Sequence, residues 1–170
     1  MKPRLGWLCL VGYTAVVAQT TLVRHLAIGA VGPDVLLTVV VFLGLFAPAY
    51  PALISAWALG LAKDVTGGGP LGAWAVLFVG AAGLLILLRD TFFIRKALTQ
   101  VLLTGVVAVP INLAYVVGRA ATQRGTTAWW VCPLLAFGSA AYTAAIAPGV
   151  VWLLGRSRTR LGLADEGRIA

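Results

Sequence analysis

Residues 98–117 read LTQVLLTGVVAVPINLAYVV, a stretch without a single charged side chain. A helix rises 1.5 Å per residue, so this stretch would be about 30 Å long, which matches the hydrocarbon thickness of a bilayer. Charges are absent from such segments because an ionised side chain at the bilayer centre costs about 2.5–3.5 kcal/mol on insertion scales. The stretch therefore predicts a membrane-spanning helix, and the fold class depends on how many more the chain contains.

Five further apolar stretches accompany it, at Leu5–Val23, Val35–Ala47, Ala52–Ala62, Leu71–Leu88 and Trp130–Leu154. The mean hydropathy is +0.98, and charged residues make up 11% of the chain, against roughly 25% in a water-soluble domain. We therefore predict an all-α polytopic integral membrane protein with six transmembrane helices. A single transmembrane domain would cover residues 1–155, followed by a short basic cytoplasmic tail at residues 156–170.

The second and third stretches are too short for an ordinary crossing, which takes about 20 residues. Pro48 and Pro51 lie between them, and proline interrupts a helix because it lacks a backbone donor. The two stretches are either short helices that cross with help from flanking residues, or a re-entrant hairpin shielded by the other helices. Two crossings is the interpretation that we adopt.

Basic residues are distributed unevenly between the two predicted sides. The amino-terminal stub, the fourth connection and the tail hold nine, namely Lys2, Arg4, Arg89, Arg95, Lys96, Arg156, Arg158, Arg160 and Arg168. The first, third and fifth connections hold four, namely Arg24, Lys63, Arg119 and Arg124. Cytoplasmic loops carry the excess of positive charge, so we predict that both termini are cytoplasmic. The first stretch imitates a signal peptide, but it lacks a clean cleavage site, and we expect an uncleaved span.

The formal net charge of +8 does not indicate a nucleic-acid partner, because the basic residues are scattered over short connections and the tail. In a membrane protein the same surplus faces anionic headgroups, so the lipid bilayer is the expected partner. Cys9 and Cys132 both lie in apolar stretches without a CxxC or histidine-rich neighbourhood. We expect two apolar side chains there, with no metal and no cofactor.

Catalysis and ion transport both lack the residues that they need. His25 is the only histidine, no paired intramembrane Asp or HExxH is present, and no lysine follows the glycines at 67–69 as a phosphate-binding loop requires. We predict that the chain is not an enzyme. The polar residues inside the stretches could line a small pocket, although interhelical hydrogen bonds are the simpler reading; they are Gln19, Asn112, Tyr115, Ser139 and Tyr142.

Two places break the apolar pattern. Pro33-Asp34 directly precedes an apolar run, where Asp34 would cap the amino terminus of a helix. The segment 60–72 reads GLAKDVTGGGPLG, in which glycines permit a tight reversal and Gly60 permits close backbone contact. Asp64 either caps local N–H groups beside Lys63 at the membrane interface, or it is functional, as ionisable groups at membrane depth often are.

Small residues recur at every fourth position of the last stretch. One ridge consists of Ala136, Ala140 and Ala144, and a second of Ala141, Ala145 and Gly149. Each set lies on one helix face, where two backbones can approach closely. Such ridges serve both packing within one chain and packing between copies, so a homo-oligomer remains open.

Residues 33–72 resemble the signature of the MreD family, the rod shape-determining membrane proteins of bacteria. The overall length and six-span plan also agree, whereas Lys63 departs from the polar residue, often Gln, that the family has there. The resemblance implies a fold similar to the substrate-binding S-components of energy-coupling-factor vitamin transporters. The signature residues, which would bind a partner or have a structural role, are Pro33, Asp34, Gly60, Asp64, Gly68 and Gly72.

The resemblance implies a non-enzymatic scaffold subunit of the cell-elongation complex, or elongasome, in the bacterial inner membrane. Its implied partners are MreC and, through the complex, MreB, RodA and the transpeptidase of RodA, which links the chain to peptidoglycan synthesis and cell wall biogenesis. The alternative is an S-component that binds a vitamin or another small molecule. A third hypothesis, a channel or proton-coupled carrier, would depend on Asp64.

Overall fold

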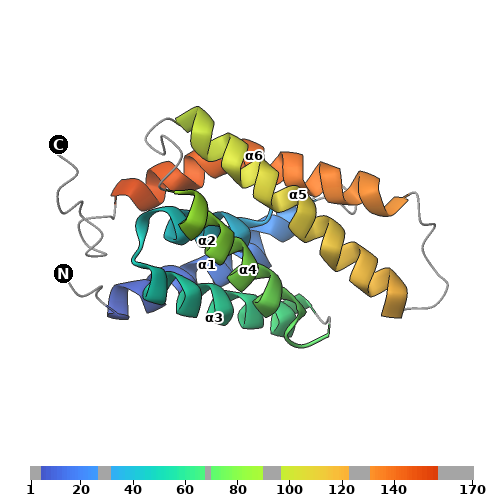
Figure 1. Cartoon of the computed structure of the whole chain (residues 1–170), viewed down its shortest axis with the longest axis horizontal. Helices are drawn as coiled ribbons and strands as arrows, with labels where there is room; N and C mark the ends of the chain where they lie inside the picture. Colours follow the sequence, from blue (N-terminus) through green and yellow to red (C-terminus); the bar gives the residue numbers. More distant parts are fainter. Residues whose placement is uncertain (1–4, 27–31, 68–69, 90–96, 123–130, 157–170) are drawn as a thin grey trace.

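The computed structural model describes residues 5–26, 32–67, 70–89, 97–122 and 131–156. This part of the chain is helical and contains no strand (Figure 1). The six helices are α1 (Leu5–Leu26), α2 (Val35–Phe46), α3 (Ala49–Gly67), α4 (Ala73–Leu88), α5 (Ala97–Thr122) and α6 (Val131–Arg156). The all-α prediction is confirmed. Of the basic tail predicted at residues 156–170, Arg156 is the last residue of α6, and the remainder lies outside the described residues.

Helix α2 is the centre of the bundle. Its residues 36–45 are all buried, which is the environment that a helix apolar on every side requires. Helices α1, α3, α4 and α6 all pack against it. The expectation of a short second helix is confirmed, because α2 has 12 residues and is therefore only about 18 Å long.

Helix α3 is longer than the sequence pattern predicts, since it has 19 residues and runs from Ala49 to Gly67. The expectation of a short third helix at Ala52–Ala62 is therefore wrong at both ends. Pro51 is tolerated because it lies in the first turn, where backbone N–H groups have no partner inside the helix. At the other end the helix continues through Lys63 and Asp64, because both charged groups find partners inside the bundle.

The helices form two closely packed antiparallel pairs, α3 with α4 and α5 with α6. The α5–α6 pair lies across the remainder of the bundle, with α6 against α2 and α5 against α4 (Figure 1). The start of α1, the end of α2, the start of α3 and the end of α6 all lie at one end of the molecule (Figure 1). An even number of crossings between the start of α1 and the end of α6 would give this arrangement.

Two of the described helices contain segments long and apolar enough to cross a membrane, Val101–Gly118 and Pro133–Arg156. Six crossings and the likeness to S-components remain predictions. Large apolar side chains are also exposed on the outer faces of several helices, more than solitary surface residues would explain. They include Leu10, Tyr13, Ile54, Trp57, Val76, Leu87, Leu102, Val106, Leu134, Phe137 and Trp152.

Candidate functional site: a buried polar centre

The amino terminus of α2 is buried, and Asp34 caps it. The backbone N–H of Leu37 donates to Oδ1 of Asp34 at 3.0 Å, and Thr38 Oγ1 donates to the carbonyl oxygen of Asp34 at 3.1 Å. Asp34 is 5% exposed. The capping role predicted for Asp34 is confirmed, and the carboxylate also lies against the positive end of the helix dipole.

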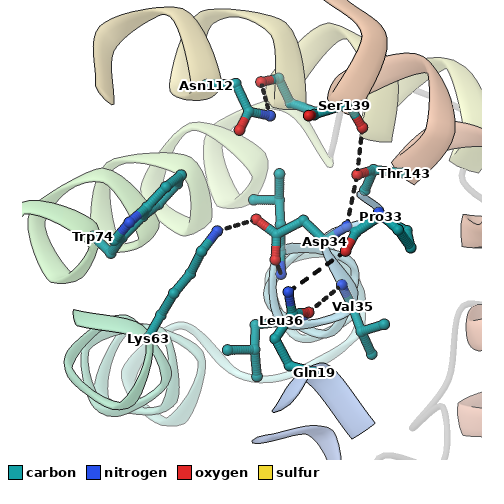
Figure 2. A network of polar contacts seen from close by, with 12 residues as sticks. Gln19, Pro33, Asp34, Val35, Leu36, Lys63, Trp74, Asn112, Ser139 and Thr143 are labelled. Atoms are coloured by element: carbon teal, nitrogen blue, oxygen red, sulfur yellow. Dashed lines mark hydrogen bonds and ion pairs between the residues drawn. The ribbon is translucent and has the colours of Figure 1, made fainter. Parts of the chain in front are cut away.

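Helix α1 holds the chain at the start of α2 through Gln19. The side-chain oxygen of Gln19 accepts from the N–H groups of Val35 at 2.8 Å and Leu36 at 3.4 Å. Its amide nitrogen donates to the carbonyl oxygen of Pro33 at 3.5 Å (Figure 2). One side chain thus satisfies three backbone groups that a buried helix start would otherwise leave unpaired.

Helix α6 contributes Thr143 to the same place. The backbone N–H of Asp34 donates to Thr143 Oγ1 at 2.9 Å, and this hydroxyl in turn donates to the carbonyl oxygen of Ser139 at 2.7 Å (Figure 2). Thr143 is fully buried near the middle of α6. The start of α2 is therefore fixed against two helices on opposite sides.

Lys63 of α3 completes the surroundings of Asp34. Its ammonium donates to Oδ2 of Asp34 in a largely buried ion pair, whose side chains are 14% and 7% exposed, and lies 3.2 Å from the ring centroid of Trp74 (Figure 2). The ring of Tyr115, from α5, stacks on Trp74 at a centroid distance of 4.2 Å. Lys63 was predicted to lie in a connection, and this is wrong, because the residue is inside α3 and inside the bundle.

Asp64 caps the next helix, α4. Its carboxylate accepts from the N–H groups of Gly72 at 2.8 Å, Trp74 at 3.1 Å and Ala75 at 3.4 Å. Asp64 is 1% exposed. Gly72 has a φ of +95°, a conformation that costs glycine little and places its N–H toward this carboxylate. The prediction that Asp64 caps N–H groups is confirmed, and these groups belong to the turn and helix that follow it.

Gly60 lets α3 and α4 touch through their backbones. A Cβ atom at residue 60 would lie 2.4 Å from Cα of Ala75 and 2.7 Å from the carbonyl oxygen of Trp74. Real Cβ atoms do not approach backbone so closely, so only glycine fits. The close approach predicted for Gly60 is confirmed, and it brings the start of α4 within reach of Asp64.

We refer to Gln19, Asp34, Lys63, Asp64, Trp74 and Thr143 together as the polar centre. Four of the six signature residues predicted from the sequence lie in it or beside it, namely Pro33, Asp34, Asp64 and Gly72. Gly60 supports it from the α3–α4 contact, and Gly68 lies outside the described residues. In the sequence Gln19 stands out only as a polar residue, and Thr143 and Trp74 do not stand out at all, because nothing local marks their partners.

The contacts of Asn112 and of the two small-residue ridges in α6 agree only partly with the predictions. Asn112 donates to the carbonyl oxygen of Ala108 at 2.9 Å, a bond within its own helix and not the interhelical bond that we expected. In α6 the first alanine ridge is packed, since Ala136 and Ala140 are buried and Ala144 approaches Gly105 of α5. The second ridge is exposed on the described surface; its members are Ala141, Ala145 and Gly149.

The polar centre connects helices and presents no reactive group. The two carboxylates accept backbone N–H groups, and the Asp34 carboxylate also accepts from Lys63. Within the described residues, no group of three His, Cys, Asp or Glu side chains comes together as a metal site. Fold and site thus define a small helical-bundle protein whose buried charges serve internal contacts.

Comparison with known protein families agrees with a helical-bundle protein of this kind. The family model described as rod shape-determining protein MreD matches residues 2–147, most of the chain. The chain belongs to the MreD family, which confirms the resemblance noted in the sequence. This family comprises shape-determining proteins and is not a known family of enzymes. No similar curated protein and no similar solved structure was found.

Proposed function

We propose that the chain is a non-enzymatic scaffold subunit of the cell-elongation complex in the bacterial inner membrane. In this role it binds MreC and links MreB to peptidoglycan synthesis by RodA and its transpeptidase. The observation that carries the proposal is the family match over residues 2–147, which gives a role in rod-shape determination and an association with the membrane. This match does not favour the alternative of a vitamin-binding S-component.

The proposed membrane placement is multi-pass with both termini in the cytoplasm. It is supported by the common end of the bundle at which α1 starts and α6 ends (Figure 1). Arg89 and Arg156 lie at the ends of α4 and α6, and the exposed aromatics Tyr50 and Trp152 lie within about one turn of the ends of α3 and α6. Exposed aromatic residues are typical of either membrane interface, and an excess of basic residues is typical of the cytoplasmic one.

The turn between α3 and α4 is the part of the chain that we propose touches a partner. Asp64 cannot make that contact, because its carboxylate is buried against the start of α4. The residues around it are open instead, since Val65 is 71% exposed and Leu71 is 77% exposed. Asp64 therefore shapes the turn, and the apolar side chains on either side of it supply the surface.

Affinity purification of the tagged chain from native membranes in mild detergent tests this proposal. We expect MreC to be recovered with the wild type, and Leu71→Ser to reduce that recovery at least several-fold. Leu87→Ser is the matched control, because Leu87 has the same 77% exposure at the opposite end of α4. Wild-type protein recovered without MreC would refute the scaffold, and equal recovery with both variants would remove the turn from the interface.

A further inference from the structure

The charges of the polar centre balance one another. The carboxylate of Asp34 lies at the amino terminus of α2, and that of Asp64, a residue of α3, lies at the amino terminus of α4; each helix dipole supplies about half a positive charge there. Lys63 adds one full positive charge, paired with Asp34 and next to Asp64 in the chain. Two negative charges therefore meet roughly two positive ones, and the polar centre is close to neutral without a bound ion.

The polar centre also lies deep along the helices. Asp34 is 13 residues from Ala47, the residue that caps the end of α2, and Thr143 is 13 residues from the end of α6 at Arg156. Gln19 and Lys63 are each 14 residues from the starts of α1 and α3. At 1.5 Å per residue all four distances are about 20 Å.

With the membrane placement proposed above, this common depth puts the start of α2 inside the bilayer. The helix ends from which these distances are counted, the starts of α1 and α3 and the ends of α2 and α6, lie together at one end of the bundle (Figure 1). If that end is at the cytoplasmic interface, a point about 20 Å away is still inside a hydrocarbon layer of about 30 Å. Helix α2 then begins inside the membrane, and its start has no water to satisfy it. The neighbouring helices must supply every partner.

We propose that Gln19, Lys63 and Thr143 form a socket that holds the amino terminus of α2 inside the bundle, and that the charges of Asp34 and Lys63 serve only to neutralise each other. Gln19 and Thr143 satisfy the backbone of the socket, while Lys63 satisfies the capping carboxylate. The ammonium is held in turn by the face of Trp74.

The test separates a neutralising pair from charges used in function. Lys63→Met removes the cation at similar length and leaves the Asp34 carboxylate buried without its partner. Breaking a buried pair in this way is strongly destabilising, so we expect the ratio of folded to unfolded protein in detergent to fall at least about 100-fold. Adding Asp34→Asn removes the remaining charge but keeps a side-chain oxygen for the N–H of Leu37.

We expect the double variant Asp34→Asn/Lys63→Met to regain most of the folded fraction and to restore rod shape in cells that lack the wild-type chain. Three results would overturn the inference. Lys63→Met could fold as well as the wild type, the double variant could remain as unstable as Lys63→Met, or it could fold normally and yet fail to restore rod shape. Folding in detergent requires no partner, so it stays informative even if MreC is not recovered with the wild type.

Discussion

Gly60→Ala should separate α3 from α4, although alanine is ordinarily the better helix residue. The added methyl group would lie 2.4 Å from Cα of Ala75 and 2.6 Å from its backbone nitrogen. Carbon atoms pack at about 3.5–4.0 Å, so the two helices must move apart by on the order of 1 Å. Both obstructing atoms belong to backbone, and no side-chain rotation can relieve the contact.

The cost follows from this displacement. Overpacking in a well-packed core costs about 1–3 kcal/mol. The same movement would stretch the bonds from Trp74 and Ala75 to Asp64, now 3.1 and 3.4 Å, beyond hydrogen-bonding range, at about 0.5–1.5 kcal/mol each. Alanine returns about 0.5–1 kcal/mol through helix propensity. Together these contributions give an expected net loss of about 1–5 kcal/mol in the free energy of unfolding, with a central value of about 3 kcal/mol.

The measurement is denaturant unfolding of the purified protein in detergent, followed by tryptophan fluorescence. Gly80→Ala in α4 is the matched control, because no atom lies within 4 Å of the position that its Cβ would take. That control should leave stability unchanged or raise it by about 0.5–1 kcal/mol. If Gly60→Ala proves as stable as Gly80→Ala, the α3–α4 backbone contact described here is incorrect.

Two further substitutions test the polar centre by the same unfolding assay. Asp64→Ala leaves three N–H groups at the start of α4 without their acceptor and should cost about 2–4 kcal/mol of stability. Asp64→Asn keeps one side-chain oxygen and should cost less. Equal stability of both variants and the wild type would contradict the capping role. Thr143→Val removes the acceptor of the Asp34 N–H and should cost about 1–3 kcal/mol of stability. Its control, Thr14→Val on the exposed face of α1, should change stability by less than about 0.5 kcal/mol. A Thr143→Val variant no less stable than Thr14→Val would show that α6 does not hold the start of α2.

Local signals in the sequence predict local structure well. Asp34 before an apolar run predicts a capped helix, and the structure has that cap, because the acceptor and its donor are only three residues apart. Gly60 likewise predicts a close contact, since a missing side chain leaves space for a neighbouring backbone. The end of α3 was predicted wrongly because a hydropathy criterion stops at Lys63 and Asp64, whereas the helix continues through both residues to Gly67.

The partners themselves could not be predicted, since they come from distant parts of the chain. Thr143 lies 109 residues from the backbone N–H that it accepts, and Gln19 lies 16 residues from Val35. Neither residue differs locally from other polar residues in an apolar helix. Lys63 was counted as a charge on one side of the membrane, and only the fold shows that Asp34 neutralises it.

The distribution of polar and small residues also indicates how one arrangement of these helices is selected. Apolar faces alone do not distinguish one packing from another in a lipid environment, because lipid tails are as apolar as leucine. Two glycines allow close contacts that a larger residue would block, Gly60 with Ala75 and Gly44 with Leu85. A Cβ atom at residue 44 would lie 3.1 Å from Cβ of Leu85. The polar centre adds bonds that exist in one register only. Specific contacts are thus concentrated inside, and the proposed contacts with lipid and with a partner fall on the apolar outer faces and the turn at Leu71.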